Sequence, residues 1–244
     1  MVDRLRNLSI INWIYPRICP VCGEIVPVME GRIHTECQGR LIPVGEPSCC
    51  KCGKPLERQE QEYCYDCLRK GHSYERGFAL WRYDCTAREA IAAFKYRGKQ
   101  EFAEFFADEL VRQFGPQLRK TGAQAFIPVP VHTSRLKSRG YNQAGLLADA
   151  LGKRLDIPVV SDYLYRQKKT EPQKGLNDRE RLRNLLQAFA VDGDKQKRFK
   201  DLKRVILVDD IYTTGSTIEA CTRVLRQAGV AHVYYVSLCI GSGI

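Results

Sequence analysis

The sequence predicts an α/β protein in which helices flank a parallel sheet and a small cysteine-rich module precedes it. From about Tyr74 onward, short apolar segments alternate with amphipathic helical patterns, which is typical of a parallel sheet. Before that point the chain has many glycines, prolines and paired cysteines and few long apolar runs. We therefore expect an N-terminal helix and a metal-binding module in residues 1–73, and the α/β domain in residues 74–244.

The cysteines of the first part form an internal repeat. A Cys-x-x-Cys pair is followed after eleven residues by a His-x-x-Cys pair, and the same spacing recurs 30 residues later with four cysteines. Each half offers four nitrogen or sulfur ligands in two close pairs, which suits tetrahedral zinc. The candidate ligands are Cys19, Cys22, His34 and Cys37 in the first half, and Cys49, Cys52, Cys64 and Cys67 in the second. We expect one or two structural zinc ions, because so small a segment needs metal to fold.

Several interpretations of the repeat stay open at this point. One metal in each half fits best, but metals that take a pair from each half are an alternative. A disulfide framework is another, although we find no signal peptide and cytosolic thiols stay reduced. A redox Cys-x-x-Cys motif is a third, although it would not explain two paired copies. Cys50 falls opposite Pro20 in the repeat and is not expected to be a ligand. Gly23 and Gly53 are expected to turn the backbone so that its N–H groups face sulfur.

The remaining elements follow along the chain. Residues 1–18 read as a short amphipathic helix. Apolar segments predict strands at 78–83, 125–131, 205–208 and 233–238, with shorter candidates at 159–160, 164–165 and 188–191. Helical periodicity predicts helices at 86–94, 102–114, 142–155, 179–186 and 216–227. Pro128 and Pro130 should force the chain out of the sheet, because proline cannot donate to a ladder.

Residues 205–217, Val-Ile-Leu-Val-Asp-Asp-Ile-Tyr-Thr-Thr-Gly-Ser-Thr, are the most informative stretch. A buried strand, two carboxylates and a turn of small residues lead into a helix. Backbone N–H groups and hydroxyls at a helix start bind anions, and the helix dipole favours the same charge. The candidate anion ligands are Thr213, Thr214, Gly215, Ser216 and Thr217.

Asp209 and Asp210 precede this turn and only accept hydrogen bonds, which suits sugar hydroxyls. The stretch therefore suggests a ribose 5-phosphate site. A P-loop is disfavoured, because no lysine follows the glycine. An ordinary strand–turn–helix unit, with or without a metal on the two carboxylates, is the alternative.

These thirteen residues resemble the signature of type I phosphoribosyltransferases, which bind phosphoribosyl pyrophosphate (PRPP). The resemblance implies that Asp209 and Asp210 contact the ribose 2- and 3-hydroxyls and that residues 213–217 wrap the 5-phosphate. It also implies Mg²⁺ bound together with PRPP, and a type I phosphoribosyltransferase-like sheet.

Basic residues elsewhere in the second part are candidates for the diphosphate. Residues 134–143 read as a flexible basic loop, in which Arg135 and Arg139 suit pyrophosphate clamping. Lys99 lies in a second basic and aromatic cluster, at 94–99. Val129 lies between the two prolines, in a rigid turn that can expose N–H groups. The low apolar content of residues 170–176 predicts a mobile lid or, equally, a disordered linker. Read alone, the basic segments are also typical of a solvated surface.

The order of these motifs resembles the ComF family of phosphoribosyltransferase-like proteins. The resemblance covers nearly the whole chain: the paired-cysteine module, the Lys-Tyr-Arg-Gly-Lys run at 95–99, Pro-Val-Pro at 128–130, Arg-Gly-Tyr-Asn-Gln at 139–143, Arg-Leu-Arg-Asn at 181–184 and the final signature. The family is associated with DNA uptake in natural competence. The resemblance implies PRPP and competence proteins as candidate partners. The basic and aromatic clusters add single-stranded DNA as a candidate, and the lack of a signal peptide predicts a cytoplasmic protein. His34 departs from the cysteine that many relatives carry.

Two classes of function follow from these observations. The first is PRPP-dependent transfer to an acceptor that the sequence does not name, with Asp209, Asp210 and Arg139 as catalytic residues. The second is a non-catalytic module that binds single-stranded DNA or senses PRPP. The formal net charge of +11 favours polyanionic partners, although it is also typical of a solvated basic surface. No apolar run reaches membrane-spanning length.

Overall fold

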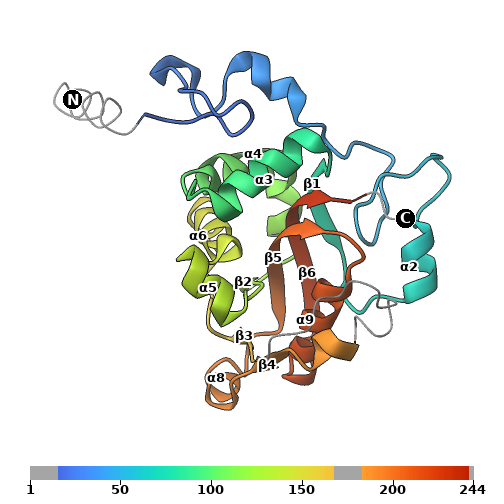
Figure 1. The fold of residues 1–244 in the computed structure, drawn as a ribbon. Coiled ribbons are helices and arrows are strands. Elements are labelled where there is room, and N and C mark those ends of the chain that lie inside the picture. Colours follow the sequence, from blue (N-terminus) through green and yellow to red (C-terminus); the bar gives the residue numbers. More distant parts are fainter. Residues whose placement is uncertain (1–15, 168–182, 242–244) are drawn as a thin grey trace.

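The computed structural model describes residues 16–167 and 183–241. Its centre is a four-stranded parallel sheet with the order β1-β6-β5-β2 (Figure 1). The strands are β1 (Gly77–Arg82), β2 (Ala125–Pro128), β5 (Arg204–Tyr212) and β6 (His232–Ile240). A separate antiparallel pair joins β3 (Leu164–Arg166) to β4 (Phe189–Val191). The predicted fold class is confirmed: helices flank a parallel sheet behind a cysteine-rich module.

Helices cover both faces of the sheet, and each face has its own core. α3 (Cys85–Tyr96), α4 (Phe102–Lys120) and α6 (Gln143–Leu155) share one core, while α9 (Ser216–Gln227) belongs to the other (Figure 1). Side chains alternate along β5 in agreement with this arrangement. Ile206 and Val208 belong to the first core, and Val205 and Leu207 belong to the second.

Shorter elements complete the described part of the chain. They are η1 (Val28–Glu30), η2 (Thr35–Arg40), α2 (Tyr65–Lys70), α5 (Thr133–Arg139) and α8 (Gly193–Arg198). Side-chain caps start four of the described helices: Asp84 accepts a hydrogen bond from the N–H of Ala87, His132 from Ser134, Asn142 from Ala144, and Asp192 from Asp194.

Most of the predicted elements that fall in the described ranges are present, with some different ends. β5 continues past the predicted end at 208, because its pairing with β6 extends to Tyr212 and Ile240. α4 continues past 114 to Lys120. The short candidate at 159–160 is a single parallel bridge between Val159 and Phe126. Residues 183–186 of the predicted helix at 179–186 are helical, and its first residues lie outside the described ranges. Most of the predicted 1–18 helix and the 170–176 lid also lie outside them.

The cysteine-rich module packs along β1, which is an edge strand of the sheet. Pro43 forms an antiparallel bridge with Trp81, and the N–H of Val44 donates to the Leu80 carbonyl at 3.1 Å. Cys19 and Cys37 join the core of α3, α4 and α6, whereas Cys49 and Cys52 join the core of α9. The two halves of the module therefore support opposite faces of the sheet. The division at residue 73 stays a prediction.

Within the described ranges, no helix combines the length and apolar character that crossing a bilayer requires.

Candidate functional site

The signature loop, residues 213–217, connects the carboxyl end of β5 to α9. Gly215 has φ +79°, a left-handed conformation that favours glycine, and α9 begins at the next residue. The hydroxyls of Thr214 and Ser216 are hydrogen-bonded at 2.9 Å. The first N–H groups of an α-helix have no partner inside the helix, so this end of α9 offers donors to an anion. The predicted strand–loop–helix order is present.

Asp209 and Asp210 differ from the prediction in one respect. They were expected to follow the strand, but the β5 pairing runs through them, and both are buried near its carboxyl end. The Asp209 carboxylate accepts a hydrogen bond from the N–H of Asp210 at 2.9 Å. The strand therefore fixes the backbone of both residues before any ligand binds.

Lys95 of α3 forms an ion pair with Asp210. The amide of Gln143, the first residue of α6, also donates to the Asp210 carboxylate at 3.4 Å. Burial lowers the pKa of Lys95 to about 8; the charge of Asp209 opposes this shift, and Arg139 and Arg135 add to it. Burial raises the pKa of Asp209 to about 7, which Lys95 partly offsets. The site thus holds two ionisable groups that titrate near neutral pH.

A basic cleft of about 200 Å³ adjoins this ion pair. Its lining is cationic and aromatic, and consists of Lys95, Tyr96, Gly98, Arg135, Ser138, Arg139 and Tyr141. The Arg139 guanidinium lies 4.9 Å from the Tyr96 ring centre and also bonds to the side-chain oxygen of Gln143. Gln143 therefore connects Arg139 to Asp210. The cleft brings a cationic surface next to the two carboxylates.

The segment that carries Arg135 and Arg139 is a helix, and the predicted flexible loop at 134–143 is wrong. The ring of His132 accepts a hydrogen bond from the N–H of Ser134 and caps α5, which ends at Arg139 and is followed by Gly140 with φ +83°. Asn142 then caps α6. The cap residue before the basic run and the glycine after it are the local signals of this helix.

Two predicted phosphate ligands lie away from the cleft. The N–H of Val129 donates to the Val208 carbonyl at 2.9 Å, so the sheet already uses the donor that we expected to face a diphosphate. Lys99 lies 3.8 Å from Glu101 in an ion pair and does not line the cleft. Conversely, sequence reasoning missed Lys95, Tyr96, Tyr141 and Gln143 as cleft or carboxylate contacts.

The predicted zinc ligands form two clusters, and each cluster comes from one half of the repeat. In each cluster the ligand atoms all lie within 4.8 Å of one another. This geometry fits one tetrahedral zinc ion per half, whereas the interleaved alternative is not what the chain adopts. We call Cys19, Cys22, His34 and Cys37 the first zinc site, and Cys49, Cys52, Cys64 and Cys67 the second zinc site.

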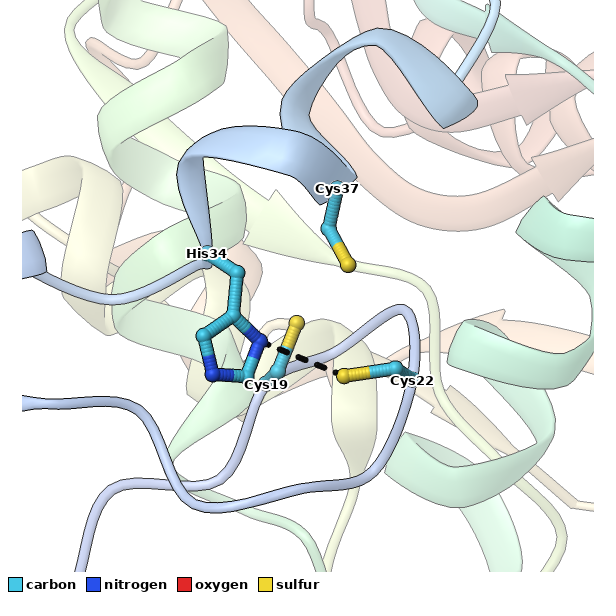
Figure 2. Close-up of side chains that lie close together, drawn as sticks. All are labelled: Cys19, Cys22, His34 and Cys37. Atoms are coloured by element: carbon cyan, nitrogen blue, oxygen red, sulfur yellow. Dashed lines mark hydrogen bonds between the residues drawn. The ribbon is translucent and has the colours of Figure 1, made fainter.

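The first zinc site has a fixed histidine. Figure 2 shows its four side chains converging, with His34 Nδ1 3.3 Å from Cys22 Sγ. His34 Nε2 lies 3.0 Å from the Ile25 carbonyl, which orients the ring and leaves Nδ1 for the metal. The donor set of three sulfurs and one nitrogen suits zinc.

The second zinc site is more deeply buried. Cys52 Sγ lies 3.6 Å from Cys64 Sγ, and the N–H of Cys64 donates to Cys49 Sγ at 3.3 Å. Gly23 and Gly53 have positive φ, as their turns require, and their own N–H groups donate to the carbonyls of Cys19 and Cys49. The backbone N–H groups of Cys22 and Cys52 in these turns face the sulfurs of Cys19 and Cys49, as predicted. Cys50 is exposed and lies outside both ligand sets.

Comparison with known proteins gives matches over most of the chain. Residues 10–68 match the double zinc ribbon domain, and residues 136–242 match the phosphoribosyl transferase domain. Competence protein F of Haemophilus influenzae is 34% identical over 218 residues, which cover 88% of this chain and 93% of that protein. DNA utilization protein YhgH of Escherichia coli K12 is 28% identical over 92% of this chain and 97% of that protein. Competence protein ComFC of Bacillus subtilis is 26% identical over 83% of this chain and 81% of that protein.

The zinc ribbon match agrees with the two ligand clusters, and together they identify structural zinc in the N-terminal module. The transferase match includes the second half of α5, α6, β5 and the signature loop, which are elements around the two carboxylates.

Proposed function

Because the chain belongs to the ComF family of competence-associated proteins, we propose that it binds Mg²⁺ and PRPP, or a related sugar phosphate, and acts in DNA uptake. The observation that carries this proposal is the grouping of three features at one edge of the sheet. Two buried carboxylates lie near the carboxyl end of β5, a helix N-terminus follows the strand, and a cationic cleft adjoins the carboxylates. A phosphorylated ribose with a diphosphate has complementary groups for all three.

Each part of this surface has a chemical role in the proposal. Asp209 and Asp210 accept hydrogen bonds from the ribose hydroxyls, and the signature loop donates to the 5-phosphate. Arg139 and Arg135 neutralise the diphosphate, with Lys95 at the junction between the carboxylates and the cleft. Mg²⁺ brought by PRPP supplies charge neutralisation at the diphosphate. The proposal assigns no part to Lys99 or Val129, since Lys99 pairs with Glu101 and the Val129 N–H donates within the sheet.

The proposed reaction is transfer of the phosphoribosyl group to an acceptor, with pyrophosphate as the leaving group. Positive charge develops at the ribose while negative charge grows on the diphosphate, so buried carboxylates beside a basic cleft favour the transition state. A panel of nucleobases, assayed for pyrophosphate release with Mg²⁺ and PRPP, tests for turnover.

Binding itself is tested by the double variant Asp209→Asn and Asp210→Asn. Calorimetric titration should show that Mg²⁺ and PRPP bind the wild type and no longer bind the variant. The variant Asp194→Asn is the matched control, because Asp194 is an exposed carboxylate on α8. Unchanged affinity in a folded double variant would defeat the proposal.

A second candidate function is binding of single-stranded DNA without turnover. The observation that favours it is Tyr96, which is 71% exposed at the cleft and carries Arg139 against its ring. Bases stack on such aromatic side chains while cations follow the phosphates. The affinity for an oligonucleotide should then fall steeply with salt, and Tyr96→Ala should weaken it about tenfold or more. A flat salt response in gel-shift titrations argues against this function. A PRPP sensor on the same site is a third, weaker alternative.

A further inference from the structure

Three buried tyrosines lie between the second zinc site and the signature loop. They are Tyr74, Tyr212 and Tyr235, which we call the tyrosine cluster, and each is at most 2% exposed. The rings of Tyr212 and Tyr235 are stacked at 4.9 Å with an interplanar angle of 4°. The hydroxyls of Tyr74 and Tyr212 are hydrogen-bonded at 2.8 Å. Such a close-packed polar and aromatic cluster transmits displacements, because it has no free volume in which to absorb them.

One end of the cluster is bonded to the second zinc site. The Tyr235 hydroxyl donates to the carbonyl of Cys52 at 2.7 Å, and this bond is buried. Gly77 makes the approach possible, since a Cβ there would lie 2.1 Å from the Tyr235 ring. The zinc ligand Cys52 is therefore attached through its own backbone to a side chain of β6.

The other end of the cluster supports the signature loop. A Cβ at Gly215 would lie 2.3 Å from the Tyr212 hydroxyl oxygen and 3.1 Å from the His72 ring. The left-handed turn before α9 thus lies directly on Tyr212. A shift of that ring would move the backbone that is proposed to bind the 5-phosphate.

A second connection reaches α9 from the same module. Ser73, shortly after the zinc ligand Cys67, donates to the Glu219 carboxylate with its N–H at 2.7 Å and its hydroxyl at 2.8 Å. Burial alone would raise the pKa of Glu219, but hydrogen bonds from His72 and Ser73 hold it at about 2, so the carboxylate is charged and anchored. Glu219 lies in the first turn of α9. The chain that leaves the second zinc site therefore fixes the start of this helix.

The first zinc site has no comparable connection among the described residues. Cys19 and Cys37 pack in the core of α3 and α4, on the opposite face of the sheet from α9. Its side of the module is joined to α4 through Arg32 and Asp108, at 3.0 Å. The two zinc sites thus differ in what they can influence.

We propose that Tyr212 and Tyr235 are positioning residues that couple the second zinc site to the signature loop. Zinc bound by Cys49, Cys52, Cys64 and Cys67 and a sugar phosphate bound at residues 213–217 then strengthen each other's binding, while the first zinc site stays independent. The inference rests on the proposed function. Coupling between two sites is reciprocal, so it is measurable from either site.

The test measures the zinc affinity of the full chain by equilibrium competition with a chromophoric chelator. The competition is run in the presence or absence of Mg²⁺ and PRPP at concentrations that calorimetry shows to be saturating. The ligand should raise the zinc affinity of the second zinc site about tenfold, within the usual range of coupling strengths, and leave the first unchanged. The Cys37→Ser variant assigns the two affinities, because it weakens the first zinc site alone.

Two variants and one control separate coupling from a general loss of stability. Tyr235→Phe removes the bond to Cys52, and Tyr212→Phe removes the bond to Tyr74, while both keep their rings. Each should reduce the tenfold effect to about twofold or less while both zinc ions remain bound. Tyr163→Phe is the control, because Tyr163 is equally buried but packs against Phe199. It should keep the full effect.

The outcomes are distinguishable. If Mg²⁺ and PRPP do not bind the wild type, the proposed function fails, and the coupling fails with it. If they bind but leave the zinc affinity unchanged, or if Tyr235→Phe retains the full effect, only the coupling is overturned. Should Cys37→Ser not fold, ¹¹³Cd-substituted wild type assigns the affinities instead, because a site of four sulfurs and a site of three sulfurs and one nitrogen give separate resonances.

Discussion

Lys95 of α3 is ion-paired with Asp210 near the end of β5, so the ammonium already occupies one of the two carboxylates proposed to bind ribose. The pair is mostly buried, with side-chain exposures of 17% and 7%. A ligand that uses Asp210 must therefore displace or share this cation. Lys95 can turn toward the basic cleft, which it also lines.

Lys95→Met should destabilise the protein by about 2–4 kcal/mol, because it leaves a buried carboxylate without its cation. Lys99→Met is the matched control. Its partner Glu101 is 3.8 Å away and half exposed, so the change should be below about 1 kcal/mol. Urea unfolding of both variants measures the difference. Equal effects would mean that the Lys95 pair does not support the fold.

The raised pKa of Asp209 predicts a pH dependence of stability. Between the ordinary value of 3.8 and the folded value of about 7, the folded protein holds a proton that the unfolded chain has lost. The contribution of Asp209 to stability therefore falls as pH rises through this window, by at most about 1.4 kcal/mol per pH unit.

Asp209→Asn removes this group, so the variant should gain stability relative to the wild type as pH rises from about 4.5 to about 6.5. Urea unfolding at several pH values measures the difference in free energy of unfolding between the variant and the wild type. The contributions of titratable groups that both proteins share cancel in this difference. A constant difference would show that Asp209 is ionised throughout.

Arg139→Ala should weaken binding of Mg²⁺ and PRPP about tenfold to a hundredfold, because the guanidinium faces the proposed diphosphate. Affinity for ribose 5-phosphate, which lacks the diphosphate, should change much less. Arg97→Ala is the control, since Arg97 is exposed and paired with Glu89. Calorimetry with both ligands measures these affinities. Equal losses for the two ligands would place Arg139 outside the diphosphate subsite.

Gly215→Ala should reduce affinity for ribose 5-phosphate at least about tenfold, because a methyl group would collide with the Tyr212 hydroxyl in addition to straining the turn. Gly229→Ala is the control, because it introduces backbone strain without a steric collision. The φ of Gly229 is also positive, +101°, but no atom lies within 4 Å of the added carbon. Binding titrations compare the two variants. Similar affinities in both would show that contact with Tyr212 is unimportant.

Local patterns predicted the parts of the site that are continuous in the chain. The eight zinc ligands follow from a repeated spacing, and the signature loop follows from thirteen adjacent residues. The alternation of apolar strands and amphipathic helices predicted the parallel sheet. These features need no knowledge of which distant segments meet.

The remaining site residues depend on tertiary contacts. Lys95 and Gln143 reach Asp210 from α3 and α6, and a basic or amide side chain does not reveal such a partner in the sequence. Val129 was misassigned because only the pairing of β2 with β5 shows that its N–H is taken by Val208. Basic composition suggested a loop at 134–143, although the caps at His132 and Gly140 favour a helix.

The edge of the sheet at β1 is covered by the segment around Pro43, which belongs to the zinc module. An uncovered edge strand invites pairing with another molecule and hence aggregation. Residues 42–44 precede β1 in the chain, so the segment that covers this edge is synthesised before the strand itself. Expressing residues 74–244 without the module would therefore leave an edge strand open that the longer chain keeps covered, and we expect such a fragment to lose solubility.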